Sequence, residues 1–306
     1  MKYAHGFHEE ESYDFKGTDV FEHQIVLENT RPKRTPEYRV SYALRDEMKS
    51  EVNKMLNIGV IRDSKSPRSS SAILHRKMSE NGKQKCSFFV QFRAINSVTN
   101  FDTYPFPVFQ GTTFNPHGSK YYIVLDCQYG FWQVSILEEH KKHRLSVPSG
   151  HFEFNKLPFG LSNSPSSFQR LMEVVTKDLV GTECCVFVDD IIIVSRSVQK
   201  HGQRLEQVLQ RIDKSKLKLH TGKSMLPQLQ VNYVGFVLSE KGVSSSPDKI
   251  KAVRNYNTPK NVKDVRSYTG LTSFYRRLIL DIATYRAHQE RQIFIWTQSQ
   301  QMPLCV

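Results

Sequence analysis

Length, composition and charge narrow the classes to which this chain can belong. It has 306 residues, 39% hydrophobic and 11% aromatic, which supports one large lobe or two to three packed lobes. Its formal net charge of +13 favours polyanionic partners, nucleic acid first among them, with an ordinary basic surface as the alternative. Five cysteines without a Cys-x-x-Cys pair indicate neither a zinc site nor a disulfide framework. Without a long apolar run or a signal-peptide core, we expect an intracellular protein, cytoplasmic or nuclear, with no membrane partner.

The first hundred residues predict little structure before residue 40 and then a helix and a β-ribbon. Apolar residues recur at helical spacing until Gly59, which ends the helix. An Asn81-Gly82 pair between two strand patterns is a strong hairpin signal, so the flanking strands should form a basic ribbon. The predicted elements are a strand at 20–27, a helix at 43–58, and strands at 71–75 and 87–90.

The rest of the chain interleaves strands and helices without an internal repeat, which is typical of an α+β fold. An apolar strand ends on Asp126, Pro165 begins a helix, and Asn261 caps the last one. The predicted elements are a strand at 121–126, a hairpin of 133–136 with 144–147, a helix at 164–179, a hairpin at 185–194, a helix around 205–212, a strand pair or tight turn at 231–238, and basic helices at 247–256 and 261–277.

Two adjacent carboxylates, Asp189 and Asp190, lie at or next to the turn of the hairpin at 185–194. A two-residue turn normally takes Asn-Gly or Asp-Gly, whereas Asp-Asp adds like-charge repulsion. The pair suits a hard divalent cation such as Mg2+, with a solvated acidic turn as the alternative. Asp126 favours the cation, because a sheet that sets its strand beside the hairpin would unite three acids. Such a cluster with two Mg2+ ions can catalyse in-line phosphoryl transfer.

Several stretches resemble a known family in their order along the chain. Leu125-Asp126 is similar to its first catalytic motif, and residues 187–190 are similar to its x-x-Asp-Asp box. Residues 56–67, 90–96, 157–169 and 273–277 match further motifs. From about Arg39 to Ile279 the chain therefore resembles the reverse transcriptases of long-terminal-repeat retrotransposons, the Gypsy/Ty3 group in particular.

This resemblance implies a right-hand polymerase fold with fingers, palm and a partial thumb. It implies an RNA-directed DNA polymerase that adds dNTPs to a primer 3′-hydroxyl on an RNA or DNA template–primer, with two Mg2+ ions or Mn2+ in their place. The implied divisions are an N-terminal extension at 1–38, fingers and palm at 39–238, thumb-like basic helices at 239–279, and a degenerate tail at 280–306 that shortens the connection to an RNase H domain.

The resemblance also implies roles for single residues at matching positions. Asp126 and Asp189 would bridge the metal ions, with Asp190 as the less directly ligating neighbour. Lys223 would protonate the departing pyrophosphate, unless it is a solvated surface lysine. The implied nucleotide-binding residues are Arg93, Phe131, Phe159, Gly160 and Gln169, and the implied primer grip is Tyr233, Val234, Gly235 and Phe236.

Two of these roles have plain structural alternatives. Phe131 falls where the family keeps an aromatic gate that clashes with a ribose 2′-hydroxyl, but a core aromatic is the alternative. Phe159 and Gly160 would line the nucleotide pocket, where glycine allows close backbone approach, but a simple loop turn is the alternative.

The chain departs from the family pattern in the motif around Arg93. Ser87 replaces an arginine that would clamp the triphosphate, and Gln91 replaces an aspartate that would position Arg93. The stretch at 143–146 is also one residue shorter than its counterpart in the family. Losing one residue from a strand inverts which side chains face the core, unless a turn absorbs the loss. A catalytically silent nucleic-acid-binding remnant is therefore the second hypothesis, while the three intact aspartates favour the enzyme.

Overall fold

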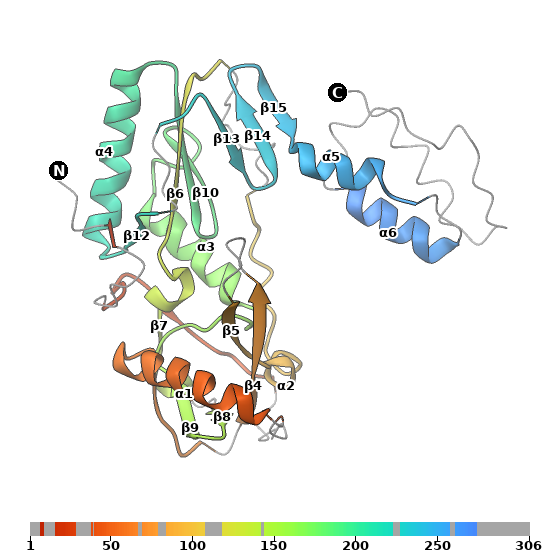
Figure 1. The fold of residues 1–306 in the computed structure, drawn as a ribbon. Helices are drawn as coiled ribbons and strands as arrows, with labels where there is room; N and C mark the ends of the chain where they lie inside the picture. The colour runs from red at the N-terminus through yellow and green to blue at the C-terminus, as the bar shows by residue number, and fades with distance from the viewer. Residues whose placement is uncertain are drawn as a thin grey trace.

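The chain folds into an upper lobe built on a three-stranded sheet and a lower lobe built on a five-stranded sheet (Figure 1). A smaller sheet and two helices lie beside the upper lobe. This computed structural model describes residues 7–8, 16–28, 38, 40–66, 69–78, 84–107, 118–141, 144–222, 227–257 and 261–273.

The central sheet of the upper lobe carries the strands on which the three acids were expected. Its strands are antiparallel, and their order is β10 (Cys184–Phe187), β11 (Asp190–Ser195) and β6 (Tyr121–Asp126). The predicted strand at 121–126 and the hairpin at 185–194 are both confirmed. The register pairs Ser195 with Tyr121 at one end and Asp190 with Asp126 at the other.

Both faces of the central sheet are buried, because successive side chains point to opposite sides of a strand. In β6, Tyr122 and Val124 belong to one apolar cluster, whereas Ile123 and Leu125 belong to the other. The three isoleucines Ile191–Ile193 have no exposed surface. Fully burying an isoleucine side chain stabilises the fold by about 1.5–3 kcal/mol, so this sheet is a rigid platform.

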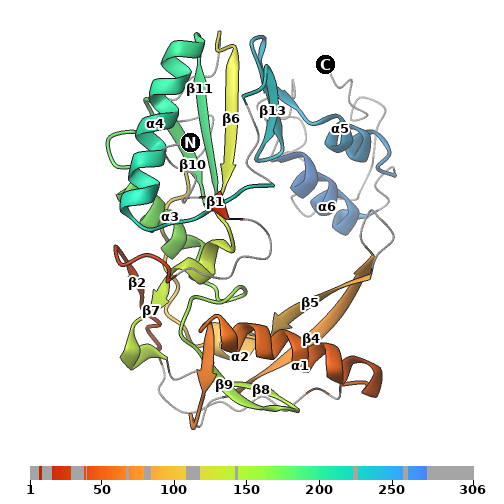
Figure 2. The same ribbon diagram turned by 60° about the vertical axis from the view of Figure 1, so that its left-hand side comes forward.

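Two helices cover one face of the central sheet (Figure 2). Helix α3 (Ser164–Val175) packs on β10, and α4 (Val198–Lys214) packs on β11. Helix α3 begins at Ser164 with Pro165 in its first turn, as predicted, but it ends at Val175, four residues before the predicted end. The apolar side chains that the two helices bring to this face include Phe168, Leu171, Met172, Val208 and Ile212.

The small sheet covers the opposite face. It consists of the antiparallel strands β13 (Gln230–Tyr233), β14 (Phe236–Ser239) and β15 (Gly242–Ser245), so the strand pair predicted at 231–238 is confirmed. Its apolar side chains Val231, Tyr233, Phe236 and Leu238 pack against that face.

Two helices, α5 (Pro247–Arg254) and α6 (Val262–Ser273), follow the small sheet. The predicted cap of α6 is present, because the backbone N–H of Asp264 donates to Asn261 Oδ1 at 2.9 Å. The predicted continuation of α6 to Arg277 lies outside the described residues. Among the helices that the structure describes, none is long and apolar enough to cross a membrane.

The lower lobe packs helix α1 (Tyr42–Asn57) on the five-stranded sheet. The helix prediction at 43–58 is confirmed, and Gly59 adopts the positive φ of +72° that follows such a helix. The predicted ribbon is also confirmed and is longer than expected, although its Asn81-Gly82 tip lies outside the described residues. The strands in spatial order are β3 (Ile61–Asp63), β9 (Gly150–Phe154), β8 (Arg144–Val147), β4 (Ser69–Met78) and β5 (Gln84–Val90).

The predicted hairpin of 133–136 with 144–147 is wrong. Strand β7 (Ser135–Ile136) pairs in parallel with β2 (Glu22–His23), while β8 pairs with β9 and β4. Gln133, the first residue of the predicted strand, instead ends a 3-10 turn, η2 (Gly130–Gln133). Only a short part of the strand predicted at 20–27 forms, because the strand with which β2 pairs, β7, is itself only two residues long.

Residues 16–28, here called the N-terminal strap, lie against the upper lobe instead of extending from it. The backbone N–H of Thr18 donates to the carbonyl of Gln133 at 2.8 Å. Gly17 has a φ of +80°, and a Cβ there would lie 2.4 Å from that same carbonyl oxygen, so only glycine fits. Farther out, β1 (Phe7–His8) pairs in parallel with β12 (Leu219–His220).

His23 of the strap is buried against α3, where its Nδ1 lies 2.7 Å from Ser167 Oγ. Burial, and then the charge of His140, lower the pKa of His23 to about 4. Below about pH 6.5 His23 of the unfolded chain therefore binds a proton, whereas His23 of the folded chain binds one only below about pH 4.

We predict that the free energy of unfolding falls by roughly 3 kcal/mol as the pH drops from about 6.5 to about 4 through this histidine alone. His23→Asn keeps a hydrogen-bonding group beside Ser167 and cannot titrate, so its unfolding free energy should fall less over the same window. Urea unfolding of both proteins at several pH values measures the difference. Equal pH slopes would contradict the assignment.

Candidate active site

The Asp-Asp hairpin turns at Val188 and Asp189, because Phe187 and Asp190 are the last paired residues of β10 and β11. Val188 has a φ of +52°. The left-handed region costs a non-glycine residue about 1–2 kcal/mol, and a β-branched residue is rare there. Asp190 is thus the first residue of a strand, and the strain of the turn is carried by the valine.

Asp126 lies directly opposite Asp190 across the β6–β11 pair. The next residue, Cys127, donates its backbone N–H to the carbonyl of Asp189 at 3.1 Å. All three aspartates are half-buried. The sheet therefore brings the three predicted acids to one edge, as the sequence argument expected.

The three carboxylates lie near one buried thiol. Burial, and then the charges of Asp189, Asp126 and Asp190, raise the pKa of Cys127 well above its usual value. Among the described residues, no three His, Cys, Asp or Glu side chains are already arranged around a single metal position. The donors nonetheless suit a hard divalent cation, because carboxylate oxygens from two neighbouring strands share one sheet edge.

Gly130 makes room for the Asp189 carboxylate. A Cβ at position 130 would lie 2.3 Å from Asp189 Oδ1 and 2.6 Å from its Cγ. Gly130 belongs to η2, which follows Asp126 after one turn. A glycine between two aromatic residues, Tyr129 and Phe131, is the signal in the sequence, but the chain alone does not show which side chain it faces.

Gln169 supports the other side of the turn at Val188 and Asp189. It is fully buried on α3, and its Oε1 accepts the backbone N–H of Val188 at 2.8 Å. Its Nε2 donates to Glu173 Oε1 at 2.9 Å and to the carbonyl of Val186 at 3.4 Å. The sequence placed Gln169 among nucleotide-binding residues, whereas its described contacts are with the hairpin and with Glu173.

An aromatic group lies on the η2 side of the acids. The ring of Phe131 is 4.9 Å from that of Phe159 and 5.6 Å from that of Phe168. Phe131 is 8% exposed, whereas Phe159 is 49% exposed. Trp132 packs edge-on against Phe159 and stacks with Tyr129. Phe131 and Phe168 therefore form the buried part of the group, which fits the alternative that Phe131 is a core aromatic. Phe159 forms its exposed part.

Gly160 and its loop are fixed by the short helix α2 (Arg93–Asn96). Asn96 Nδ2 donates to the Gly160 carbonyl at 2.9 Å, and Asn96 Oδ1 accepts the backbone N–H of Ser162 at 3.0 Å. Gly160 has a φ of +99° and lies against Phe92. Arg93 is exposed on the same helix. The predicted residues Arg93, Phe159 and Gly160 are therefore held close to one another.

The predicted primer grip is a two-residue turn between β13 and β14. Val234 and Gly235 have φ values of +47° and +79°, which is the conformation of the favoured hairpin turns. Tyr233 Oη donates to the carbonyl of Asp190 at 3.4 Å. Burial, and then the neighbouring Cys185 and Asp190, raise the pKa of Tyr233 well above its usual value, so its hydroxyl keeps the proton.

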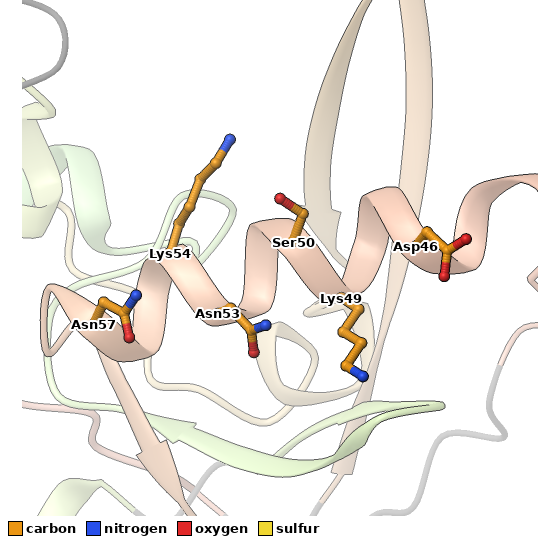
Figure 3. Close-up of a pocket in the computed structure, with 6 residues that line it drawn as sticks. All are labelled: Asp46, Lys49, Ser50, Asn53, Lys54 and Asn57. Carbon is orange, nitrogen blue, oxygen red and sulfur yellow. The ribbon is translucent and has the colours of Figure 1, made fainter.

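Two other features lie apart from the acids. Lys223 falls outside the described residues, so its role remains a prediction from the motif. A shallow hollow of about 470 Å³ lies on the outer face of α1 in the lower lobe (Figure 3), and none of the predicted site residues lines it. Its lining residues all come from α1 and are Asp46, Lys49, Ser50, Asn53, Lys54 and Asn57.

The chain is similar in sequence to known proteins. Residues 72–238 match the family model described as reverse transcriptase (RNA-dependent DNA polymerase). The retrovirus-related Pol polyprotein from transposon opus of Drosophila melanogaster is 34% identical over 81% of this chain and 25% of its own length. The corresponding polyprotein from transposon gypsy of the same organism is 33% identical over 83% of this chain and 25% of its own length. The chain thus spans about a quarter of these relatives, and the predicted resemblance to Gypsy-type elements is confirmed.

A solved structure shares the fold. The foamy viral protease-reverse transcriptase in complex with RNA/DNA hybrid superposes with a TM-score of 0.76 at 19% identity, over 98% of this chain and 41% of that one. The predicted right-hand α+β fold is therefore confirmed.

The contact between Gly130 and Asp189 can be tested by unfolding measurements. Gly130→Ala should lower the free energy of unfolding by roughly 1–3 kcal/mol, because overpacking displaces the carboxylate. In an Asp189→Ala background the same change should cost much less. Gly202→Ala is the matched control: nothing lies within 4 Å of a Cβ there, and alanine in α4 should stabilise by up to about 1 kcal/mol. Equal costs of Gly130→Ala in both backgrounds would contradict the contact.

Proposed function

The chain belongs to the reverse transcriptase family, and on that premise we propose that it is an RNA-directed DNA polymerase. In this proposal it adds deoxynucleotides to a primer 3′-hydroxyl as directed by an RNA or DNA template. The observation that carries the proposal is the meeting of Asp126, Asp189 and Asp190 at one edge of a sheet buried on both faces.

Asp126 and Asp189 are the residues that would hold the two divalent ions, with Asp190 as their less directly ligating neighbour. When bound, a pair of Mg2+ or Mn2+ ions lowers the pKa of the attacking hydroxyl and neutralises the leaving pyrophosphate. The chain itself contributes a fixed position for each acid. Gly130 leaves space for Asp189, Gln169 holds its turn, and the strand register holds Asp126 opposite Asp190.

The incoming nucleotide would lie on the aromatic side of the acids. Phe131 is anchored from below by Phe168, so its ring resists displacement and can exclude a ribose 2′-hydroxyl. The exposed Phe159 and the cation of Arg93 offer an apolar surface and a phosphate contact. Gly160 lets the backbone of the same loop approach a ligand closely.

The template and primer would lie between the lobes in the family arrangement. We assign the lower lobe to the fingers, the central sheet with α3 and α4 to the palm, and α5 with α6 to a partial thumb. The turn at Tyr233–Phe236 would grip the primer, and the net charge of +13 suits a duplex tracked through its phosphates.

A silent nucleic-acid-binding protein of the same fold is the second candidate. The observation that favours it is the exposure of Arg93 next to Gln91, where the family pattern has an aspartate to position the guanidinium. Ser87 also removes one cation that would contact the triphosphate. Such a protein would still bind the duplex but would not catalyse nucleotide addition.

Primer extension on an RNA template with Mg2+ separates the two candidates. The wild type should extend the primer, and Asp189→Asn should reduce the rate at least about a hundredfold, because it removes an anionic ligand without changing the side-chain shape. Binding of the same primer–template, measured by fluorescence anisotropy, is the control and should change little. If the wild type extends no better than the variant while both bind, the silent protein is correct.

The gate assigned to Phe131 makes a separate prediction. Phe131→Val should raise the use of ribonucleotides relative to deoxynucleotides at least about tenfold, because it removes the steric conflict with a 2′-hydroxyl. Phe152→Val is the matched control, since it makes the same change at a buried phenylalanine of β9 in the lower lobe and should leave that ratio unchanged. Competition between dNTPs and rNTPs in primer extension measures the ratio. An unchanged ratio in Phe131→Val would leave Phe131 as a core aromatic.

A further inference from the structure

A run of side-chain hydrogen bonds reaches the catalytic turn from the surface of the upper lobe. It ends at Val188, whose backbone N–H donates to Gln169 Oε1 at 2.8 Å. The other side-chain atom of Gln169, Nε2, donates to Glu173 Oε1 at 2.9 Å. Because one end of this amide must donate and the other must accept, the Glu173 carboxylate fixes which end faces the turn.

Glu173 is in turn held by a residue outside α3. Its second oxygen, Oε2, accepts a hydrogen bond from the hydroxyl of Tyr104. Burial, and then the Glu173 carboxylate itself, raise the pKa of Tyr104 to about 12, so the hydroxyl remains a donor at neutral pH. Both oxygens of Glu173 thus have donors, and the carboxylate has one preferred orientation.

Residues 101–107, here called the anchor loop, are themselves fastened to α3. Asp102 forms an ion pair with Arg170 at 3.0 Å, and its backbone N–H donates to Asn163 Oδ1 at 3.1 Å. The guanidinium of Arg170 also lies 4.5 Å from the centre of the Tyr104 ring. The donor of the hydrogen-bond run is therefore held in place independently of Glu173.

The anchor loop touches the hairpin a second time. The ring of Phe106 lies 6.1 Å from that of Phe187, which is the residue paired with Asp190. On the opposite side of the turn, Cys127 holds the carbonyl of Asp189. The turn is thus fixed by backbone on one side and by α3 and the anchor loop on the other.

We propose that Tyr104 and Glu173 are positioning residues for the polymerase reaction, which act through Gln169 to hold the strained Val188 turn and so the carboxylate of Asp189. The inference rests on the proposed function for its catalytic consequence. Neither residue touches the substrates or the reacting atoms in this assignment. Their effect is on the geometry of the acid and hence on the chemical step.

The test compares Glu173→Ala, Glu173→Gln and Tyr104→Phe with Val174→Ala, a control at an exposed position of α3 that takes no part in the run. Hydrogen exchange of the Val188 amide is measured by NMR in each folded protein, together with kcat and KM for dNTP in primer extension. Glu173→Ala should speed that exchange about tenfold and lower kcat about fivefold or more, with KM within about twofold of the wild type.

Two comparisons separate positioning from a general loss of structure. Glu173→Gln should restore most of kcat, because its amide oxygen accepts from Gln169 and its amide nitrogen can donate to the Tyr104 hydroxyl oxygen. Tyr104→Phe should lower kcat alone but add little in the Glu173→Ala background, since both changes break the same run. Val174→Ala should resemble the wild type in every measurement.

Some outcomes overturn the proposal. Unchanged Val188 exchange in Glu173→Ala shows that the run does not hold the turn. Faster exchange with unchanged kcat in an active enzyme shows that the turn does not limit catalysis. If the wild type extends no primer, the proposed function fails instead, and the exchange measurements still decide whether Tyr104 and Glu173 hold the turn.

Discussion

The opposition of Asp126 and Asp190 across one strand pair is the constraint on which the rest of the structure depends. Two residues paired in an antiparallel sheet have Cα atoms about 4.5–5.5 Å apart, so their like charges repel. The repulsion is offset by apolar burial on both faces of the same strands, where Ile191, Ile192 and Leu125 are almost wholly enclosed. A sheet with one face exposed to solvent would hold these acids less firmly.

Two residues with a strained backbone lie beside this pair of acids. Val188 and Val234 both adopt positive φ, one in the turn of the Asp-Asp hairpin and one in the turn of the small sheet. Such residues persist only where the surroundings determine the conformation. Gln169 does so for Val188, and Tyr233, whose hydroxyl reaches the Asp190 carbonyl, ties the second turn to the first.

Local patterns predicted the elements that depend on local physics. The strand at 121–126, the helix at 43–58 and the Asp-Asp hairpin follow from periodicity, and the ordered motifs identified the family. The hairpin of 133–136 with 144–147 failed because alternation does not say which strand is the partner, and β7 pairs with β2 instead. The sequence does not show what Gly130 and Glu173 contact, since their importance comes from contacts with residues distant in the sequence.

The N-terminal strap also bears on how the chain is made. The strap and β1 leave the ribosome before the rest of the upper lobe, and β1 pairs with β12, which follows the strands and helices of the central sheet in the chain. Closing so long a loop is entropically slow, and such non-local pairings delay folding. His23 and the strap backbone therefore stay exposed to water until the residues that they contact have been synthesised. The strap and β1 can therefore pack only after the rest of the upper lobe has been synthesised. Nascent chains are vulnerable to proteases and mispairing until then.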